Sequence, residues 1–429
     1  MSEIEDLRKR LARLGVRLGV QGLQPSSAST LLPLTTQPAP PRDAIEDWVP
    51  GRVVETEAGA CFLSELRYPL EHLHGPIPLG ALLESTPATL SGLAGEVGGD
   101  SLRDDFRRFV FLDTETTGLA GGTGTYAFLV GLGVFEDEEF VVRQYFMRDI
   151  PEERAMLALL REAMEPHEGL VTFNGRAFDW PLLETRFAMN RQPAPQRAAA
   201  RHLDLLLPAR RLWRLRLSSC ALSSLEEHVL NVSRGQDDVP GWAIPGLYRD
   251  YLTWGRAEPM RRVFYHNAHD ILSLATLAAL LCRSVREPLQ ALKHGEDLFG
   301  LGRHLEAQGD MEAAVRLYQH CLRCKLPPKT REAVMRRLSQ IHRRYGQLQE
   351  AVTLWHALAE EGDFEACVEL AKYYEHRVGN LTLAHKMARQ ARDLLQQFRY
   401  PDRRKLAEVE RRLQRLEVKA GRRAQAGRG

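Results

Sequence analysis

The most regular hydrophobic pattern in the chain runs from about residue 106 to about residue 283. Short apolar runs typical of strands alternate there with stretches whose apolar residues recur every three to four positions. The strand candidates are "FVFLD", "AFLVGLGVF", "FVVRQYF" and "GLVTFN", and the helix candidates are "ERAMLALLREAM", "PLLETRFAMN" and "DILSLATLAALL". Three consecutive strands followed by a helix and another strand predict an α/β domain with a mixed sheet covered by helices. We place it at residues 50–285, because a further strand pair is predicted before its core at 106–283.

The last third of the chain has only the helical period. Gly309, Gly346 and Gly379 each precede an alanine by five residues, and these glycines lie 37 and 33 residues apart. A period near 34 residues is typical of tetratricopeptide-like repeats, although a generic array of helical hairpins would look similar. We therefore predict an all-α repeat domain over residues 290–418, which should bury a core of its own, and a loose basic tail over residues 419–429.

The first 48 residues do not continue either pattern. Four leucines at four-three-four spacing predict an amphipathic helix over residues 1–22. Residues 23–48 are rich in serine, threonine, proline and alanine, which predicts a flexible linker. The N-terminus is charged and lacks the apolar stretch of a signal peptide, and we expect no membrane span.

Composition narrows the class of protein only modestly. A hydrophobic content of 44% and a charged content of 27% are ordinary for a soluble protein. Six scattered cysteines suit a reducing compartment, so we expect a cytoplasmic protein. The net charge of +2 means that any nucleic-acid partner must be bound by a local basic patch.

Candidate chemistry begins where the first core strand ends, at Asp113 and Glu115. Side chains two apart on a strand point to the same side, so these two carboxylates should project together. Bare carboxylates that lie side by side repel, and a divalent cation relieves the repulsion. The alternative is that both acids only cap a turn.

Two later segments carry similar chemistry. Asn174 ends a strand and Asp179 begins a helix, where it would equally serve as an N-cap. His266 and Asp270 are four residues apart on a predicted helix and therefore share one face. Such a pair by itself is more typical of a solvated surface than of a functional site. We interpret Asp204, which lies between these segments, as structural.

Taken in order, the three motifs resemble those of the DnaQ-like, or DEDD, 3′–5′ exonucleases of the ribonuclease H-like superfamily. The surrounding sequence, including "FNGRAFDWPLL" and "DVPGWAIPGLYRDYL", is similar to that of the YprB-like branch of the superfamily. A tetratricopeptide-like C-terminal region also occurs in that branch. The residues that match the family motifs are Asp113 and Glu115, then Asn174, Phe178 and Asp179, then His266 and Asp270.

The resemblance implies a metal-dependent nuclease that removes nucleotides from a 3′ end of DNA or RNA. Asp113, Glu115, Asp179 and Asp270 would hold two Mg²⁺ or Mn²⁺ ions, roughly 3.5–4 Å apart in such sites. The base that takes a proton from water is expected five residues before the last Asp when it is a His, and four before when it is a Tyr. Here Tyr265 and His266 occupy these slots in reverse, so both stay open.

We favour His266 as the base, because an imidazole titrates near neutral pH and a phenol does not. We expect a single-stranded 3′ end to be bound beside the acids and by the stretch "PARRLWRLRLSSC", since arginine contacts phosphate and tryptophan stacks on bases. A solvated basic helix face is the alternative for that stretch. The predicted nucleic-acid-binding residues are Thr116, Asn174, Phe178, Arg211, Trp213 and Arg214.

A second hypothesis is a non-catalytic adaptor that binds nucleic acid and recruits a protein partner through its helical repeats. The complete set of four acids favours the enzyme. The glycine-rich loop at residues 118–126 offers backbone N–H groups that could meet a phosphate, although a wide hairpin would have the same composition.

Overall fold

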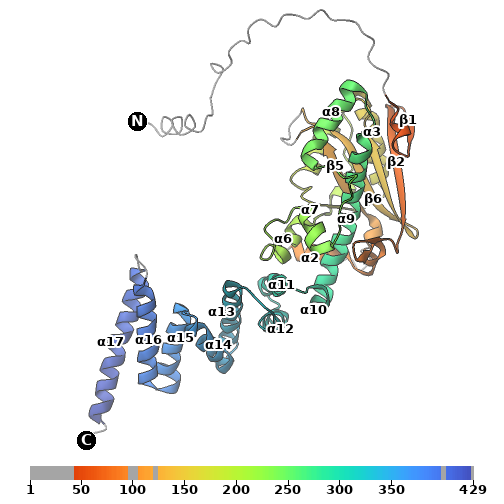
Figure 1. Ribbon diagram of the computed structural model, residues 1–429. Helices are drawn as coiled ribbons and strands as arrows, with labels where there is room; N and C mark the ends of the chain where they lie inside the picture. The colour runs from red at the N-terminus through yellow and green to blue at the C-terminus, as the bar shows by residue number, and fades with distance from the viewer. Residues whose placement is uncertain (1–42, 95–104, 119–123, 398–401, 427–429) are drawn as a thin grey trace, which may run out of the picture. The chain divides into compact units, whose positions relative to one another are not determined.

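The computed structural model describes residues 43–94, 105–118, 124–397 and 402–426 (Figure 1). The predicted helix at residues 1–22, most of the predicted linker and the middle of the glycine-rich loop lie outside these ranges. The end of the predicted linker is not a linker, because Ile45 in the short 3-10 helix Ile45–Asp47 is only 1% exposed. The ordered fold therefore begins before the predicted boundary at residue 50.

Seven strands form one mixed sheet in the order β1-β2-β7-β6-β5-β8-β9. The strands from β1 to β5 in that order pair antiparallel, whereas β8 is parallel to β5 and β9 is parallel to β8. The strands are β1 (Arg52–Thr56), β2 (Gly59–Pro69), β5 (Phe109–Thr116), β6 (Ala127–Glu136), β7 (Glu139–Phe146), β8 (Gly169–Thr172) and β9 (His202–Asp204), with a separate pair β3 (Leu73–His74) and β4 (Ile77–Pro78). This confirms the predicted α/β class.

Helices pack around the sheet, and the last third of the described chain contains helices without strands (Figure 1). Those of the first two thirds are α2 (Pro87–Ala94), α3 (Glu153–Met164), α4 (Asp179–Met189), α5 (Gln196–Ala199), α6 (Leu206–Trp213), α7 (Leu222–Leu225), α8 (Ile244–Trp254) and α9 (Met260–Arg286). Those of the last third are α10 (Pro288–Ala291), α11 (Gly295–Gln308), α12 (Met311–Cys321), α13 (Pro328–Arg344), α14 (Leu348–Glu360), α15 (Phe364–Tyr373), α16 (Leu381–Gln396) and α17 (Arg403–Ala426).

The central strand β5 separates two cores. Phe109 and Phe111 pack into a core that contains much of α9, while Val110 and Leu112 pack into a second core with α3 and α8. Because side chains alternate along a strand, Asp113 and Glu115 continue the face of Phe111. The two acids therefore point toward the side of the sheet that α9 covers.

Two glycines of β6 allow α9 to approach the sheet closely. A Cβ atom on Gly131 would lie 2.3 Å from Asn267 Oδ1, and one on Gly133 would lie 2.6 Å from Ile271 Cγ2. Both distances are far shorter than a normal contact, so the sheet has no room for a side chain there. Gly131 is also the register partner of Asp113 on β5, which brings α9 next to the acids.

Gly131→Ala is expected to lower the free energy of unfolding by about 1–3 kcal/mol, the usual cost of overpacking a core. Chemical denaturation measures this loss. Gly92→Ala is the matched control, because no atom lies within 4 Å of a Cβ at Gly92 on α2. Equal midpoints for Gly131→Ala and the wild type would contradict the close packing of α9.

Helix α9 is long and apolar enough to cross a membrane by length and composition. However, 72% of its most apolar 18-residue stretch is buried inside the fold. We therefore interpret α9 as the core helix of the α/β domain.

The repeated glycines of the last third end helices. Gly309, Gly346 and Gly379 have φ angles of 90°, 75° and 71°, a left-handed conformation that favours glycine at the end of a helix. The alanines five residues later, Ala314, Ala351 and Ala384, are fully buried. The sequence repeat is thus a helix stop followed by a close helix contact, and the predicted all-α region is confirmed. Most of the predicted loose tail is helical instead, because α17 continues to Ala426.

The first helices of this region share a core with the α/β domain. Leu212 of α6 belongs to one buried cluster with Leu298 of α11, Tyr318 of α12 and Leu338 of α13. A second cluster, which contains Trp355, lies farther along the helices. The expectation that the repeats bury their core only among themselves is therefore wrong for α11 to α13.

Ending the chain at residue 287 is expected to give an aggregating protein, because the apolar face of α6 that α11 covers would be exposed. Ending it at residue 347 keeps α11 to α13 and should give a soluble, cooperatively unfolding chain. Size-exclusion chromatography and thermal denaturation of the two truncated proteins test this. A soluble, monomeric 1–287 fragment would show that the shared core is dispensable.

Candidate active site

Four carboxylates from three elements meet at one end of β5. Asp113 and Glu115 lie on β5, Asp179 is the first residue of α4, and Asp270 lies on α9. Carboxylate oxygens of Glu115 and Asp270 and a ring nitrogen of His266 all lie within 4.8 Å of one another. The structure therefore brings the sequence-predicted acids together with the predicted imidazole.

Each of the other two acids is held by a hydrogen bond from a neighbour. Asn267 Nδ2 donates to Asp113 Oδ2 at 2.9 Å, and Gln144 Nε2 donates to Asn267 Oδ1 at 3.0 Å. The Thr114 hydroxyl donates to Asp179 Oδ1 at 2.5 Å. Phe178, not Asp179, occupies the N-cap position of α4, so the alternative that Asp179 serves as the N-cap is wrong.

The acids crowd one another in a buried site. Burial, together with the charges of Asp270, Glu115 and Asp179, raises the pKa of Asp113 well above its usual range. Burial and the charges of Asp270 and Asp179 do the same for the pKa of Glu115. Burial raises the pKa of Asp179 to about 6, although the Thr114 hydroxyl opposes this shift. The cluster is costly to charge as it stands.

The donor set fits a divalent cation. Glu115 is 8% exposed, and its Oε1 atom is buried without a hydrogen-bond partner among the described residues. Buried carboxylate oxygens normally have a partner, and the groups close to Glu115 include the Asp270 carboxylate and the His266 imidazole. Oxygen ligands of this kind suit Mg²⁺ or Mn²⁺. Asp113, Glu115, Asp179 and Asp270 are the residues that would hold such an ion.

His266 lies in the site and Tyr265 does not. His266 Nε2 is 3.6 Å from Asp270 Oδ2. The Tyr265 ring packs 5.4 Å from the His269 ring, and its hydroxyl accepts a weak hydrogen bond from Gly235 N at 3.4 Å. The roughly 100° turn between consecutive helical residues separates their directions.

Asp238 orients the imidazole. Its Oδ1 atom lies 2.7 Å from His266 Nδ1. Arg234 Nη1 lies 2.9 Å from the same ring nitrogen, so Nδ1 is held by both neighbours. The Nε2 atom lies on the side of Asp270, 3.6 Å from its Oδ2 atom.

Arg234 is a further residue of the site. Its guanidinium binds Glu226 through Nε and Nη2, both at 2.7 Å, and Nη2 also donates to Asp270 Oδ1. Its Nη1 atom lies 2.9 Å from His266 Nδ1. Burial raises the pKa of Asp270, and the charge of Arg234 opposes that shift. The arginine thus places a positive charge beside one of the four acids.

The support of Arg234 continues into the core. Glu226 is 1% exposed and accepts a hydrogen bond of 2.5 Å from the Ser273 hydroxyl, which lies 2.8 Å from His74 Nε2. His269 Nδ1 is 3.9 Å from Glu226 Oε1. His269 therefore faces this buried network.

Asp204 has the structural role expected from the sequence. Its carboxylate accepts hydrogen bonds from Asn174 N at 2.8 Å, Arg176 N at 3.2 Å and Leu206 N at 3.0 Å. These bonds fix the turn after β8, where Asn174 has a left-handed φ of 64°. The turn leads directly into the helix that carries Asp179.

The residues predicted to bind nucleic acid differ in whether their side chains are exposed or already bonded within the fold. Phe178 is 60% exposed beside Asp179, whereas the Thr116 hydroxyl donates to the Gly118 carbonyl at 2.9 Å. Arg214 is exposed, and Arg211 is half-buried and donates to the Leu93 carbonyl.

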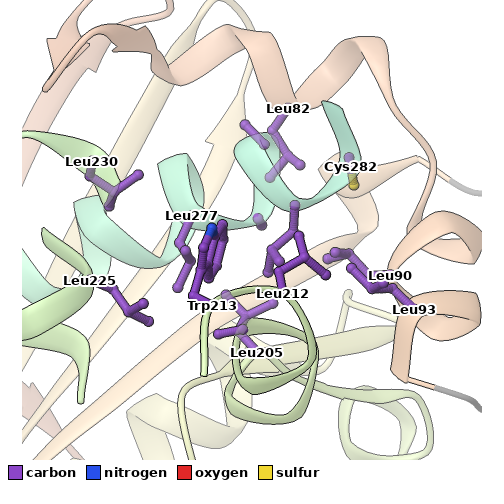
Figure 2. Packing of buried hydrophobic residues seen from close by; sticks show 14 of the residues in the cluster. Leu82, Leu90, Leu93, Leu205, Leu212, Trp213, Leu225, Leu230, Leu277 and Cys282 are labelled. Carbon is purple, nitrogen blue, oxygen red and sulfur yellow. The ribbon is translucent and has the colours of Figure 1, made fainter. Parts of the chain in front are cut away.

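Trp213 is a correction to the sequence analysis. Its side chain is 1% exposed and packs in the core, where Figure 2 shows it among leucines that include Leu212 and Leu277. The predicted stacking of this indole on a base is therefore wrong. Trp213 anchors α6 against α9 instead.

Comparison with known proteins agrees with this architecture. Residues 110–282 match the family described as the RNase_H superfamily. The chain is also 29% identical over 338 residues to the uncharacterized protein YprB of Bacillus subtilis (strain 168). The aligned residues cover 77% of this chain and 80% of that protein. The fold of residues 110–282 is ribonuclease H-like, as the motifs predicted, and it is followed by the all-α region.

Proposed function

We propose that this ribonuclease H-like protein is a metal-dependent nuclease that hydrolyses phosphodiester bonds, acting as a 3′–5′ exonuclease. The observation that carries the proposal is the convergence of four carboxylates, one with an unpartnered buried oxygen, beside an oriented imidazole. Buried acids that repel one another destabilise a fold, so a purely structural role does not account for them. Paired Mg²⁺ or Mn²⁺ ions, when bound, would supply an acidified water and stabilise the charge that develops on the leaving oxygen.

The protein groups divide the remaining tasks. Asp113, held by Asn267, and Asp179, held by Thr114, present fixed oxygens for the ions. His266, held at Nδ1 by Asp238, takes the proton from the attacking water through Nε2. Such preorganised groups lower the barrier because they need no rearrangement as the reaction proceeds.

Exposed aromatic side chains support action on an unpaired strand end. Phe178 adjoins Asp179 in the chain, and Trp242, 77% exposed, follows Asp238 by four residues. A base can stack on either ring without sequence preference. An end, rather than a continuous duplex, can place an unstacked base against them.

End-labelled DNA and RNA oligonucleotides, incubated with Mg²⁺, Mn²⁺ or EDTA, test the proposal. We expect a ladder of products shortened from the 3′ end, with Mg²⁺ or Mn²⁺ and not with EDTA. Label position distinguishes the polarity, because a 5′ label gives the ladder and a 3′ label gives a released mononucleotide. Binding without cleavage under all metal conditions would favour the non-catalytic adaptor.

A further inference from the structure

A cleft of about 890 Å³ lies between α6 and the helices α11 to α13. None of the four acids lines it, and it is strongly basic. Its lining carries five arginines against one glutamate, Glu306. The arginines are Arg210, Arg211 and Arg214 at α6, Arg303 on α11 and Arg337 on α13.

The two walls of the cleft are fixed against each other. A Cβ atom on Gly300 of α11 would lie 2.4 Å from the Arg211 carbonyl oxygen, so the two backbones are in direct contact. Arg216 Nε donates to Asp297 Oδ1 at 2.9 Å, and the Asp297 side chain is only 3% exposed. Because the contact is tight and includes a buried ion pair, the cleft is a permanent feature of the fold.

The positive charge of the cleft has few anionic partners. Glu306 Oε2 already binds Arg337 Nη1 at 2.9 Å and the Tyr318 hydroxyl at 2.6 Å. Within the described ranges, Arg210, Arg214 and Arg303 form no ion pair with a carboxylate. The Arg211 guanidinium donates to the Leu93 carbonyl, and burial lowers its pKa. An anion in the cleft would relieve this accumulated charge.

The cleft starts at the same edge of the sheet as the acidic site. Helix α6 begins directly after β9, which runs parallel to β8 and β5, so all three end at that edge. Arg210 and Arg214 follow the first residue of α6 by one and two turns, about 6 and 12 Å along the helix. A strand that leaves the acidic site along α6 would reach these arginines within a few nucleotides.

We propose that this cleft binds the phosphodiester backbone of the nucleic acid whose 3′ end enters the acidic site. The proposal rests on the nuclease function proposed above and extends it to the helical region. Guanidinium groups bind phosphates in bidentate fashion and fix the strand without reading its sequence. Leu207 and Leu215, 48% and 43% exposed, offer apolar surface for the sugars and bases between the phosphates.

Binding of a 5′-fluorescein 20-mer of DNA or RNA, measured by anisotropy in EDTA over a range of salt concentrations, tests the cleft. Arg210→Ala/Arg214→Ala/Arg303→Ala should weaken binding about 10- to 100-fold at 0.1 M salt and reduce the slope of log K against log salt by about 2, roughly 0.7 per lost phosphate contact. The matched control removes three exposed arginines outside the cleft, Arg323, Arg344 and Arg389, and should retain the wild-type slope.

The lysine variant of the same three positions keeps the charge and should keep most of the slope, which separates loss of phosphate contacts from loss of folding. Equal losses for the cleft variant and its control would overturn the proposal. A competition experiment gives the second contrary outcome. If a poly-glutamate peptide displaced the fluorescent strand with higher affinity than unlabelled DNA or RNA at the same charge concentration, the proposal would also be overturned. The cleft would then be a docking site for an acidic protein. Because no cleavage is needed, absence of nuclease activity would not affect this result.

Discussion

Replacing Asp113 by asparagine is expected to abolish metal-dependent cleavage while leaving the protein folded. Asp113 lies between the charges of Asp270, Glu115 and Asp179, so it is the acid best placed to serve more than one ion. An amide keeps an oxygen that can accept the hydrogen bond from Asn267, but it lacks the charge that holds a cation. We expect a loss of roughly 10³-fold or more in single-turnover rate, since metal ions contribute several kcal/mol to such barriers.

The same substitution should raise the melting temperature of the metal-free protein. The pKa of Asp113 and Glu115 is raised by burial, and that of Asp179 is raised to about 6 from an ordinary value near 4. The folded state then binds more protons than the unfolded state, so stability falls as pH rises from about 4 through 6. Removing one acid reduces this penalty at neutral pH.

Thermal denaturation with and without Mn²⁺ measures both effects. For the wild type, Mn²⁺ should raise the melting temperature more at pH 8 than at pH 5, because ion binding competes with protons for the acids. Asp113→Asn should show little response. Asp250→Asn, at an exposed position on α8, is the control and should behave as the wild type. Full cleavage by purified Asp113→Asn would remove Asp113 from the site.

The periodic elements of the fold and the four acids could be predicted because each depends on local pattern. The alternation of Phe109 and Phe111 with Val110 and Leu112 gives β5 two buried faces, and continuing that period carries Asp113 and Glu115 to one side. His266 and Asp270 needed only the helical period. Their convergence was then implied by resemblance to a known order of motifs.

Arg234, Glu226 and Asp238 could not be found in this way. They lie in a π-helical turn and an irregular segment between α7 and α8, where no period indicates which side chains point inward. Their inward direction depends on residues of α9 that lie 28 and 36 positions later in the chain. Only packing of that helix against the segment brings Arg234 to Asp270 and Asp238 to His266.

At Trp213 two local patterns of the sequence indicate different roles. Ala209, Leu212 and Trp213 recur at helical spacing and are all buried, whereas Arg210 and Arg214 are exposed on the other face. The helical period therefore assigns the tryptophan to the core. Interleaved basic and aromatic residues suggested a nucleic-acid surface, and only the basic residues face outward.

His266→Ala is expected to reduce the single-turnover rate by roughly 10²- to 10⁴-fold, the usual cost of losing a general base. Binding of Mn²⁺, followed by thermal shift, should persist because the four carboxylates remain. The wild-type rate should rise with pH until the base is fully deprotonated and then level off, since only an unprotonated base accepts a proton. Asp238→Asn should also slow the reaction, because it removes the carboxylate that holds the imidazole at Nδ1.

Tyr265→Phe is the matched comparison on the same helix. It removes only a hydroxyl that accepts a 3.4 Å bond from Gly235 N, so the rate should stay within about twofold of the wild type, as for most changes away from the reacting groups. The two substitutions together decide which residue accepts the proton from water. If Tyr265→Phe lost the pH-dependent rate while His266→Ala kept it, the phenol would be the base, and α9 would have to rotate by about 100° to bring it to the acids.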